Sequence, residues 1–427
     1  MLTLRLIVCF SIPLGWCAEA CADWPHWRGA NRSGVVAESS GFAKGRWLGE
    51  KPLWRTSVGR GGSSPLAVSE RVYAFGWKSG NEVVSCLATD SGKEVWSQSY
   101  QAPQYARTAL GDMGQYAGPS STPELDAATG YLSTLGIDGH LHCWDTAKKG
   151  ERVWGFNLND RYKVVQRPRV GTSGHRDYGF TTSPLVHGDW LLVEVGAAQG
   201  SVIAFDKRTG KEAWRSELAE PAGHTGGLAP ITVEGIPCIA VLTHFHLAVI
   251  RLDKGSEGKT LARYPWVTDF GNSIPTPAVE GPHVVITSAY NHMTICKLKI
   301  TRKGAEKLWE TKYPSGVCSP IIHKGRVYLS WKTIRCLDFE TGKQLWSGEN
   351  TGIPGSCIVT SDDRLIVWCK SGDLLLVDTA VRAPDAFKLV AERRGVLNDL
   401  VWPHVVLARG KLYCRDRAGT LVCISTQ

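Results

Sequence analysis

Basic and aromatic side chains gather in two long stretches of the chain, residues 101–118 and 159–180. The second stretch carries a local charge of +3, a third of the formal net charge of +9. The candidate ligand-binding residues in these stretches are Tyr105, Arg107, Tyr116, Arg167, Arg169, His175, Arg176 and Tyr178. Guanidinium groups beside aromatic rings suit an anion or a polar polymer, so we predict a binding rim. The alternative is a solvated loop whose arginines cap carbonyl groups and pair with acids.

Three histidines, His224, His244 and His246, fall close to the same predicted surface. His244 and His246 are two residues apart, so their side chains point the same way if the chain is extended. A zinc site needs three or four such ligands at fixed distances, and no known spacing motif is matched. We therefore expect structural or exposed histidines and no metal site.

Motifs of other chemistries do not stand out. We find no Ser-His-Asp arrangement, phosphate-binding glycine loop or paired-carboxylate motif. No motif for binding RNA or DNA occurs either, and we expect no nucleic-acid partner. A hydrolase or lyase built from unrecognised loop residues stays open as a third hypothesis.

The long stretches separate copies of a repeat. Its clearest copy runs from Ala204 to Trp214 and reads Ala-x-Asp-x-x-Thr-Gly-Lys-x-x-Trp. The Gly supplies a positive φ for a turn, and the Asp can hydrogen-bond the turn backbone. The Trp is too large for one small sheet to cover, so it must pack against the next sheet. The predicted docking residues are Trp54, Trp96, Trp154, Trp214, Trp309 and Trp346.

A second motif, Ser or Thr followed by Pro, opens each unit. Copies begin at Ser64, Thr122, Ser183, Thr276 and Ser319. Proline cannot donate to a strand ladder, so it marks the start of a first strand. Two further apolar strands and the Trp-bearing strand follow. Units of four strands that bury Trp against each other predict a ring of sheets, a β-propeller.

The positions of the repeats give the number of blades. Complete units begin near residues 62, 120, 181, 227, 274, 317 and 356. Residues 397–427 supply three more strands, and residues 51–55 around Trp54 supply the missing fourth. We therefore predict an all-β, eight-bladed propeller of four-stranded antiparallel blades, closed by the N-terminal strand, with seven blades as the alternative. The propeller would span residues 51–427 as one domain, after an extension at residues 23–50.

Strand direction assigns the long stretches to one face of this ring. Strands alternate in direction, so the connections between blades and the second-to-third strand turns share a face. Residues 101–118, 159–180 and 219–228 are all connections between blades. Connections this long in a compact repeat are usually functional. We call this the long-loop face.

Residues 1–22 are typical of a secretory signal, with Arg5 before an apolar run and Ala20-Cys21-Ala22 as a cleavage site. Glu19 makes Cys21 a poor lipidation site. The signal predicts export to the periplasm or the cell exterior, or association with the envelope. No other stretch is apolar enough to span a membrane.

Ten of the thirteen cysteines lie beyond this signal. Cys86, Cys143, Cys336 and Cys423 share one repeat position, where Ala204 stands in the third unit. Cysteine behaves there as a small hydrophobe. We expect most of the ten to be free and structural.

Composition agrees with a turn-rich β protein. Gly is 46 and Trp is 17 in 427 residues, and 43% of residues are apolar. This apolar fraction excludes a disordered chain, and the absence of long Ala-, Glu-, Lys- and Leu-rich blocks excludes a coiled coil.

The repeat resembles the tryptophan-docking motif of the pyrroloquinoline quinone (PQQ)-like propellers. The opening residues 23–29, Asp-Trp-Pro-His-Trp-Arg-Gly, resemble the start of an exported bacterial subgroup of that family. The family includes quinoprotein alcohol dehydrogenases and BamB-like assembly factors. The resemblance covers essentially the whole chain after the signal.

The resemblance implies one of two functions. The first is an exported, non-catalytic binding or scaffold propeller, BamB-like, which needs no cofactor. It would bind a protein or cell-envelope polymer on the long-loop face as a monomer. The alternative is a quinoprotein alcohol dehydrogenase with PQQ and calcium. The catalytic members carry a ring of two adjacent cysteines, and this sequence has no Cys-Cys pair.

Overall fold

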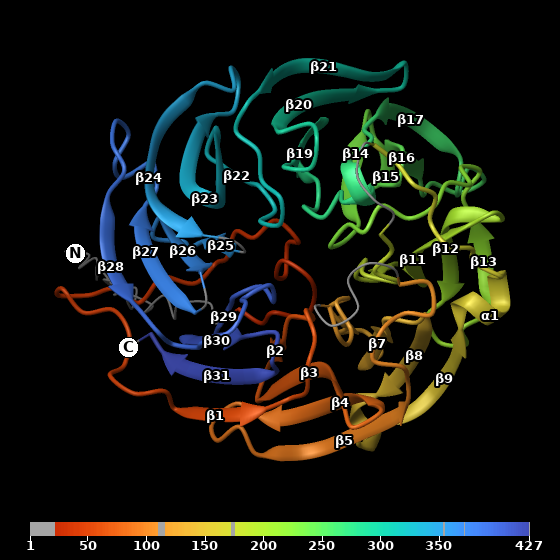
Figure 1. Ribbon diagram of the computed structural model, residues 1–427, viewed down its shortest axis with the longest axis horizontal. Helices are drawn as coiled ribbons and strands as arrows, with labels where there is room; N and C mark the ends of the chain where they lie inside the picture. The colour runs from red at the N-terminus through yellow and green to blue at the C-terminus, as the bar shows by residue number, and fades with distance from the viewer. Residues whose placement is uncertain (1–21, 110–115, 172–175, 353–354, 371, 427) are drawn as a thin grey trace, which may run out of the picture.

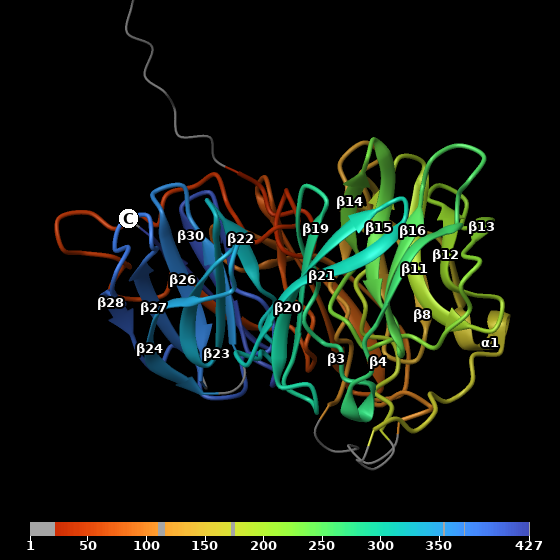
Figure 2. The same ribbon diagram turned by 90° about the horizontal axis from the view of Figure 1, so that it is seen from above.

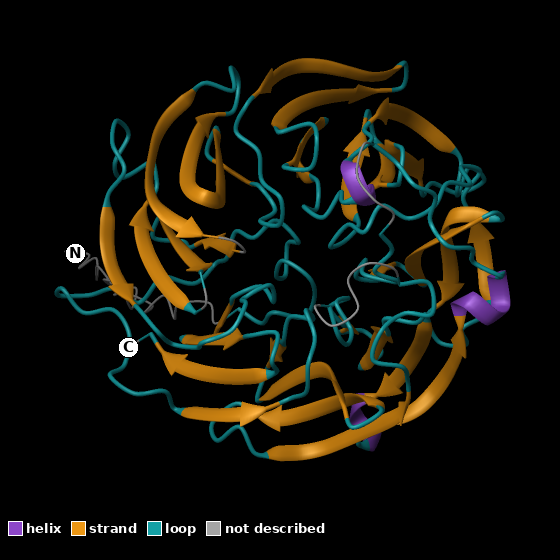
Figure 3. Cartoon of the chain, in the orientation of Figure 1, coloured by secondary structure: helices purple, strands orange, loops and turns teal. Residues whose placement is uncertain are grey.

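The computed structural model describes residues 22–109, 116–171, 176–352, 355–370 and 372–426. The predicted signal at residues 1–22 falls outside these ranges except for its last residue. Eight antiparallel sheets surround a central axis, and the chain order runs round the ring (Figure 1). Strands form almost all of the regular structure of the described residues (Figure 3). The predicted eight-bladed, all-β propeller is confirmed.

The first four blades are continuous in sequence. Blade one comprises β2 (Leu66–Val68), β3 (Arg71–Lys78), β4 (Asn81–Ala88) and β5 (Glu94–Gln101). Blade two comprises β6 (Glu124–Asp126), β7 (Tyr131–Leu135), β8 (His140–Asp145) and β9 (Glu151–Asn157), with a 3-10 turn at Thr146–Lys148. Helix α1 (Leu158–Tyr162) leads to blade three, β10 (Leu185–His187), β11 (Trp190–Ala197), β12 (Gly200–Asp206) and β13 (Glu212–Arg215). Blade four comprises β14 (Ala229–Val233), β15 (Ile236–Leu242), β16 (His246–Arg251) and β17 (Thr260–Pro265).

A second 3-10 turn, Asp269–Gly271, precedes the last blades. Blade five comprises β18 (Ala278–Glu280), β19 (His283–Ser288), β20 (Thr294–Thr301) and β21 (Gly304–Thr311). In blade six, β23 (Arg326–Asp338) covers both middle positions, pairing first with β22 (Ile321–His323) and then with β24 (Gln344–Gly352). Blade seven comprises β25 (Gly355–Val359), β26 (Arg364–Cys369), β27 (Asp373–Asp378) and β28 (Leu389–Arg393).

The eighth blade joins the two ends of the described chain. It comprises β29 (Val406–Ala408), β30 (Lys411–Arg415) and β31 (Thr420–Ser425), with β1 (Trp54–Ser57) as the outer strand. β1 pairs with β31 from Trp54 opposite Cys423 to Ser57 opposite Thr420. This is the closure that the sequence predicts, and it removes two free sheet edges.

The blade tryptophans dock as the repeat predicts. A Cβ added to Gly92, in the turn before β5, would lie 2.5 Å from the indole of Trp54. Gly150 and Trp96, and Gly210 and Trp154, form the same pair at the next two interfaces. Each indole therefore lies flat on the turn of the following blade, where only glycine leaves room.

The cysteines that share a repeat position lie beside these tryptophans. Cys86 pairs in register with Trp96, Cys143 with Trp154 and Cys336 with Trp346, while Ala204 pairs with Trp214. All ten cysteines that the structure describes are buried and free. The small side chain at this position leaves room for the large one opposite.

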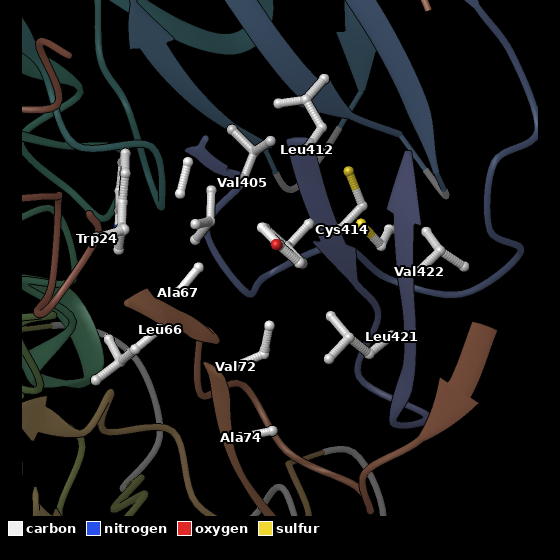
Figure 4. Close-up of a cluster of buried hydrophobic side chains, with 14 of the residues drawn as sticks. Trp24, Leu66, Ala67, Val72, Ala74, Val405, Leu412, Cys414, Leu421 and Val422 are labelled. Carbon is white, nitrogen blue, oxygen red and sulfur yellow. The ribbon is translucent and has the colours of Figure 1, made fainter. Parts of the chain in front are cut away.

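An N-terminal segment, residues 23–40, crosses the axis on one face of the ring (Figure 2). Trp24 forms two backbone hydrogen bonds with Ala67 of blade one. Val35 forms a parallel bridge to Val359 of blade seven. Figure 4 shows Trp24 at the inner end of the apolar cluster between blades eight and one, near Leu66 and Ala67. The segment thus links blade one to blade seven, the two blades that flank blade eight.

Candidate functional site

A cavity of about 110 Å³ lies on the propeller axis. Every blade contributes to its wall, because the chain reaches the axis at the start of each blade. Its lining residues are Trp27, Gly62, Tyr116, Ser120, Ile137, Tyr178, Thr181, His224, Gly226, Asn272, Ile274, Tyr290, Val317, Cys318, Ser319, Gly355, Ser356, Trp402 and His404. Among the residues that the structure describes, this lining contains no Asp, Glu, Lys or Arg.

Aromatic rings form one side of this axial cavity. Tyr116 stacks on Trp402 with ring centroids 4.8 Å apart, and it meets Tyr178 edge-on at 5.1 Å. The guanidinium of Arg417 covers both rings of the stack, 4.9 Å from Tyr116 and 4.6 Å from Trp402. Rings held this way present flat apolar faces, which suit a planar or apolar group of a ligand.

Trp27 of the N-terminal segment closes the cavity on the other side. Its indole N–H donates to Thr276 Oγ1 at 2.9 Å. Added Cβ atoms at Gly226 and Gly227 would lie 2.9 Å and 2.5 Å from the ring, so both glycines are needed for its approach. The N-terminal segment is therefore part of the cavity wall, which the sequence pattern does not predict.

Two polar atoms at the cavity have no hydrogen-bond partner among the described residues. Asn272 is 4% exposed, and its Oδ1 accepts no hydrogen bond. The indole N–H of Trp402 also lacks an acceptor. An unpaired buried acceptor is costly, so the cavity offers one acceptor and one donor to water or a ligand.

Arg107 of the predicted rim is held by two acids. It donates to Asp138 from Nε and Nη2, the latter at 2.7 Å, and from Nη1 to Asp160 at 2.7 Å. The carboxylates raise the pKa of Arg107 above its ordinary value. Its side chain is 45% exposed, so one edge still faces solvent.

Arg167 lies in a buried network rather than on an exposed rim. Its Nη1 is 2.5 Å from Asp177 Oδ1, and its Nε donates to the carbonyl of Ala222. Burial opposes ionisation of Asp177, but the charge of Arg167 and the hydrogen bond from its backbone N–H lower the pKa of that carboxyl. This pairing fits the alternative that loop arginines bind acids and carbonyl groups.

The histidines at this face are structural in their contacts. His224 is buried between Asp177 and the carbonyl of Gly271, and burial lowers its pKa to about 4. His244 contacts the carbonyl of Pro168, and burial lowers its pKa to about 4 as well. His246 Nδ1 instead lies 2.7 Å from Glu220 Oε1, so His244 and His246 have different hydrogen-bond partners.

The remaining predicted residues are spread over the face. Tyr105 is half-buried, Arg169 is exposed, and the guanidinium of Arg176 lies 4.3 Å from the ring centre of Phe270. His175 lies outside the described residues. The structure thus brings Tyr116 and Tyr178 to the cavity with His224, and it leaves Arg107 and Arg169 at the surface.

Sequence reasoning misses several residues that shape the site. Trp402, Arg417 and Asn272 stand in short connections without a motif, and only their aromatic or polar type could have indicated them. It also misses Glu82, which is fully buried and accepts hydrogen bonds from Tyr100 Oη and the Ile137 N–H of blade two. Burial raises the pKa of Glu82 to about 7.

The residues present do not fit PQQ with calcium. The quinone carries several carboxylates, and the described cavity lining offers no Lys or Arg to bind them. The described part of the chain also has no cluster of three His, Cys, Asp or Glu that could hold a metal ion.

The Trp-docked blades, Ser/Thr-Pro starts and Thr-Gly turns define a PQQ-like β-propeller. A family model described as outer membrane protein assembly factor BamB matches residues 137–243. BamB of Burkholderia pseudomallei (strain K96243) is 24% identical over 348 residues, 76% of this chain and 78% of that protein. Quinohemoprotein alcohol dehydrogenase ADH-IIG of Pseudomonas putida is 26% identical over 157 residues, 36% of this chain and 19% of that enzyme.

Solved structures share the fold. BamB from Moraxella catarrhalis has a TM-score of 0.61 at 12% identity, covering 88% of this chain and 99% of that one. Quinohemoprotein alcohol dehydrogenase from Comamonas testosteroni has a TM-score of 0.59 at 14% identity, covering 96% and 81%. The chain is a β-propeller that is similar to BamB and to quinohemoprotein alcohol dehydrogenases. Within the described residues, no helix has the length and apolar character to cross a membrane.

Proposed function

We propose that this propeller is an exported binding or scaffold module that catalyses no reaction and binds a protein of the cell envelope on its long-loop face. The observation that carries the proposal is the axial cavity. Its described lining holds aromatic, small and neutral polar groups and no carboxylate or cation. Its two histidines, His224 and His404, are buried, and burial lowers the pKa of each to about 4. Walls of this apolar and neutral polar kind suit recognition of a partner.

The charged groups of the long-loop face support the same function. Arg107 is fixed by Asp138 and Asp160, and Arg167 is buried against Asp177. Groups held in this way shape a rigid surface, and they are not poised for proton transfer. The match to BamB over 76% of the chain favours a protein as the partner.

An exposed valine marks the surface for a test. Val165, in the connection from α1 to blade three, is 73% exposed. Val381, in the turn between β27 and β28 on the opposite face, is 45% exposed and is the matched control. A photo-crosslinking amino acid is placed at each position in turn, and the protein is expressed in cells that contain its native cell envelope. Crosslinking then identifies the molecules that contact each face.

We expect a discrete crosslinked protein at position 165 and none at position 381. Equal crosslinking at both positions, or none at 165, would contradict a partner on the long-loop face. The assay does not need the partner to be known beforehand.

The dehydrogenase alternative has its own test. Purified protein with PQQ and calcium would be examined for a bound quinone spectrum and for dye-linked alcohol oxidation. We expect neither, because the described cavity lacks a cation for the quinone carboxylates. A bound, redox-active quinone would replace the binding function with an oxidoreductase.

A further inference from the structure

Two cysteines of neighbouring blades meet at the axis. Cys318, just before the Ser319-Pro320 motif of blade six, and Cys357 in β25 have sulfur atoms 3.6 Å apart. Both side chains are buried, each 2% exposed, and Cys318 lines the axial cavity. They do not occupy the position beside the docking tryptophans that other cysteines share, so packing of those indoles does not account for them.

A buried arginine without an acid partner lies beside this pair. Arg28 of the N-terminal segment is 1% exposed. Its Nη2 donates to the carbonyl groups of Ser33 at 2.8 Å and Pro320 at 2.6 Å, and its Nε has no partner. The described residues give it no salt bridge. A buried charge without a counter-ion is costly, and Cys318 and Cys357 are the groups whose negative charge favours it.

The contacts make the two sulfurs unequal. The two thiols are within hydrogen-bond distance of each other, and the Cys318 thiol also contacts the carbonyl of Ser319 at 3.6 Å. The hydrogen bond with Cys357, a backbone contact with Ser330 and the charge of Arg28 lower the pKa of Cys318. The same bond, together with burial, raises the pKa of Cys357. One sulfur is thereby favoured as the thiolate and the other as the thiol, which is the arrangement of a reactive dithiol.

We propose that Cys318 and Cys357 form a peroxide-reactive dithiol that closes to a disulfide between blades six and seven. The thiolate of Cys318 attacks a hydroperoxide oxygen, the O–O bond breaks, and the leaving alkoxide or hydroxide takes a proton from water. Cys357 then attacks the sulfenic sulfur. The S–S bond forms, the S–O bond breaks, and the hydroxyl leaves as water with the Cys357 proton. The two thiols supply the two electrons that reduce the peroxide.

Geometry gives this reaction its place in the fold. Hydrogen peroxide is small enough for the axial cavity that Cys318 lines. The sulfurs need only approach to about 2.0 Å to bond. The product would covalently join two blades beneath the N-terminal segment. The proposal is independent of what the long-loop face binds.

The test uses the purified chain without its signal. After treatment with hydrogen peroxide, the protein is unfolded, its free thiols are alkylated, and its peptides are mapped. We expect two thiols to be lost and one linked species that joins the Cys318 and Cys357 peptides. In Cys357→Ser, we expect oxidation to stop at a Cys318 sulfenic acid, which dimedone traps. Cys238→Ala, a change in blade four, should leave the linkage unaltered.

The role of Arg28 is tested by rate. In Arg28→Met, oxidation should slow by about tenfold or more, because the thiolate loses its cation. Arg28→Lys keeps the charge and should lie closer to wild type. The proposal is overturned if all ten thiols remain after peroxide, or if dimedone marks cysteines other than Cys318. It is also overturned if Cys357→Ser yields no dimedone adduct at Cys318. This measurement uses a chain in which Arg28 is unchanged.

Discussion

The hydroxyl of Thr122 accepts a hydrogen bond at 3.0 Å from the backbone N–H of Ser64, the residue at the same repeat position in the preceding blade. The backbone N–H of Thr122 in turn donates to the hydroxyl of Ser183 at 3.0 Å. Thr276 and Ser319 repeat the contact between blades five and six. The Ser/Thr of the Pro motif therefore joins neighbouring blades around the axis, in addition to preceding a strand.

Removal of one such hydroxyl should weaken the ring. Thr122→Val keeps the side-chain shape but leaves the buried N–H of Ser64 without an acceptor. We expect the free energy of unfolding to fall by about 1–3 kcal/mol, measured as a lower urea midpoint. Thr260→Val in β17 is the control, because its hydroxyl has no hydrogen-bond partner among the described residues, and it should change stability little. Equal effects of the two substitutions would contradict the role of the axial hydroxyls.

Glycines beneath the docking tryptophans should tolerate no side chain. Gly210 has φ +69°, and an added Cβ would lie 2.7 Å from the Trp154 ring. Gly235 has φ +81° but open space around the same position. Substitution by Ala strains the backbone at both positions. Gly210→Ala should lower the free energy of unfolding by roughly a further 1–3 kcal/mol, because the Trp154 indole must move. Thermal melting compares the two, and a similar shift in both would rule out the docking explanation.

The two loop arginines should behave differently. Arg167→Met leaves Asp177 buried without its cation and should lower the free energy of unfolding by about 3–5 kcal/mol. Arg169 is exposed, and Arg169→Met should cost at most about 1 kcal/mol, because interactions at an exposed guanidinium contribute little. Urea unfolding of both variants measures this. A stable Arg167→Met protein would show that the buried ion pair is dispensable.

Glu82 should make stability depend on pH. Burial raises its pKa from 4.5 to about 7 in the folded chain. Between these values the unfolded chain ionises while the folded chain keeps its proton, so this group's contribution to stability falls as pH rises from 4.5 to 7. Glu82→Gln mimics the protonated acid. Its stability relative to wild type should therefore increase across that window, by an amount on the order of 3 kcal/mol.

Melting temperatures from pH 4.5 to pH 8 measure this difference. Glu50→Gln, at an exposed loop position, is the control and should follow the wild-type curve. A constant difference between Glu82→Gln and wild type across this range would mean that Glu82 ionises normally in the folded chain.

The blades could be predicted because their physics is local and repeated. The turn that needs Gly210, the Trp that needs a neighbouring sheet, and the small residue that pairs with it recur in the sequence. The closure through Trp54 could also be predicted from the sequence. The last unit lacks its Trp-bearing fourth strand, and the N-terminal strand with Trp54 supplies it. The register of Cys86 with Trp96 agrees with the shared repeat position.

The axial site could not be predicted in the same way. Trp27 and Arg28 belong to a segment without repeats, so no pattern places them at the axis. Tyr116 meets Trp402 only because the ring closes, and these residues are far apart in sequence. The positive charge of the loop predicted a binding rim. It did not predict which arginine would pair with Asp177 and become buried.

The central claim is that the long-loop face binds a protein partner. The protein crosslinked at position 165 can be purified, and its affinity for wild type, Val165→Asp and Val381→Asp can be measured by calorimetry. We predict that Val165→Asp weakens binding by at least about tenfold, because a charge is buried at the contact, whereas Val381→Asp binds like wild type. Unchanged affinity for Val165→Asp, or an equal loss for Val381→Asp, would contradict the account.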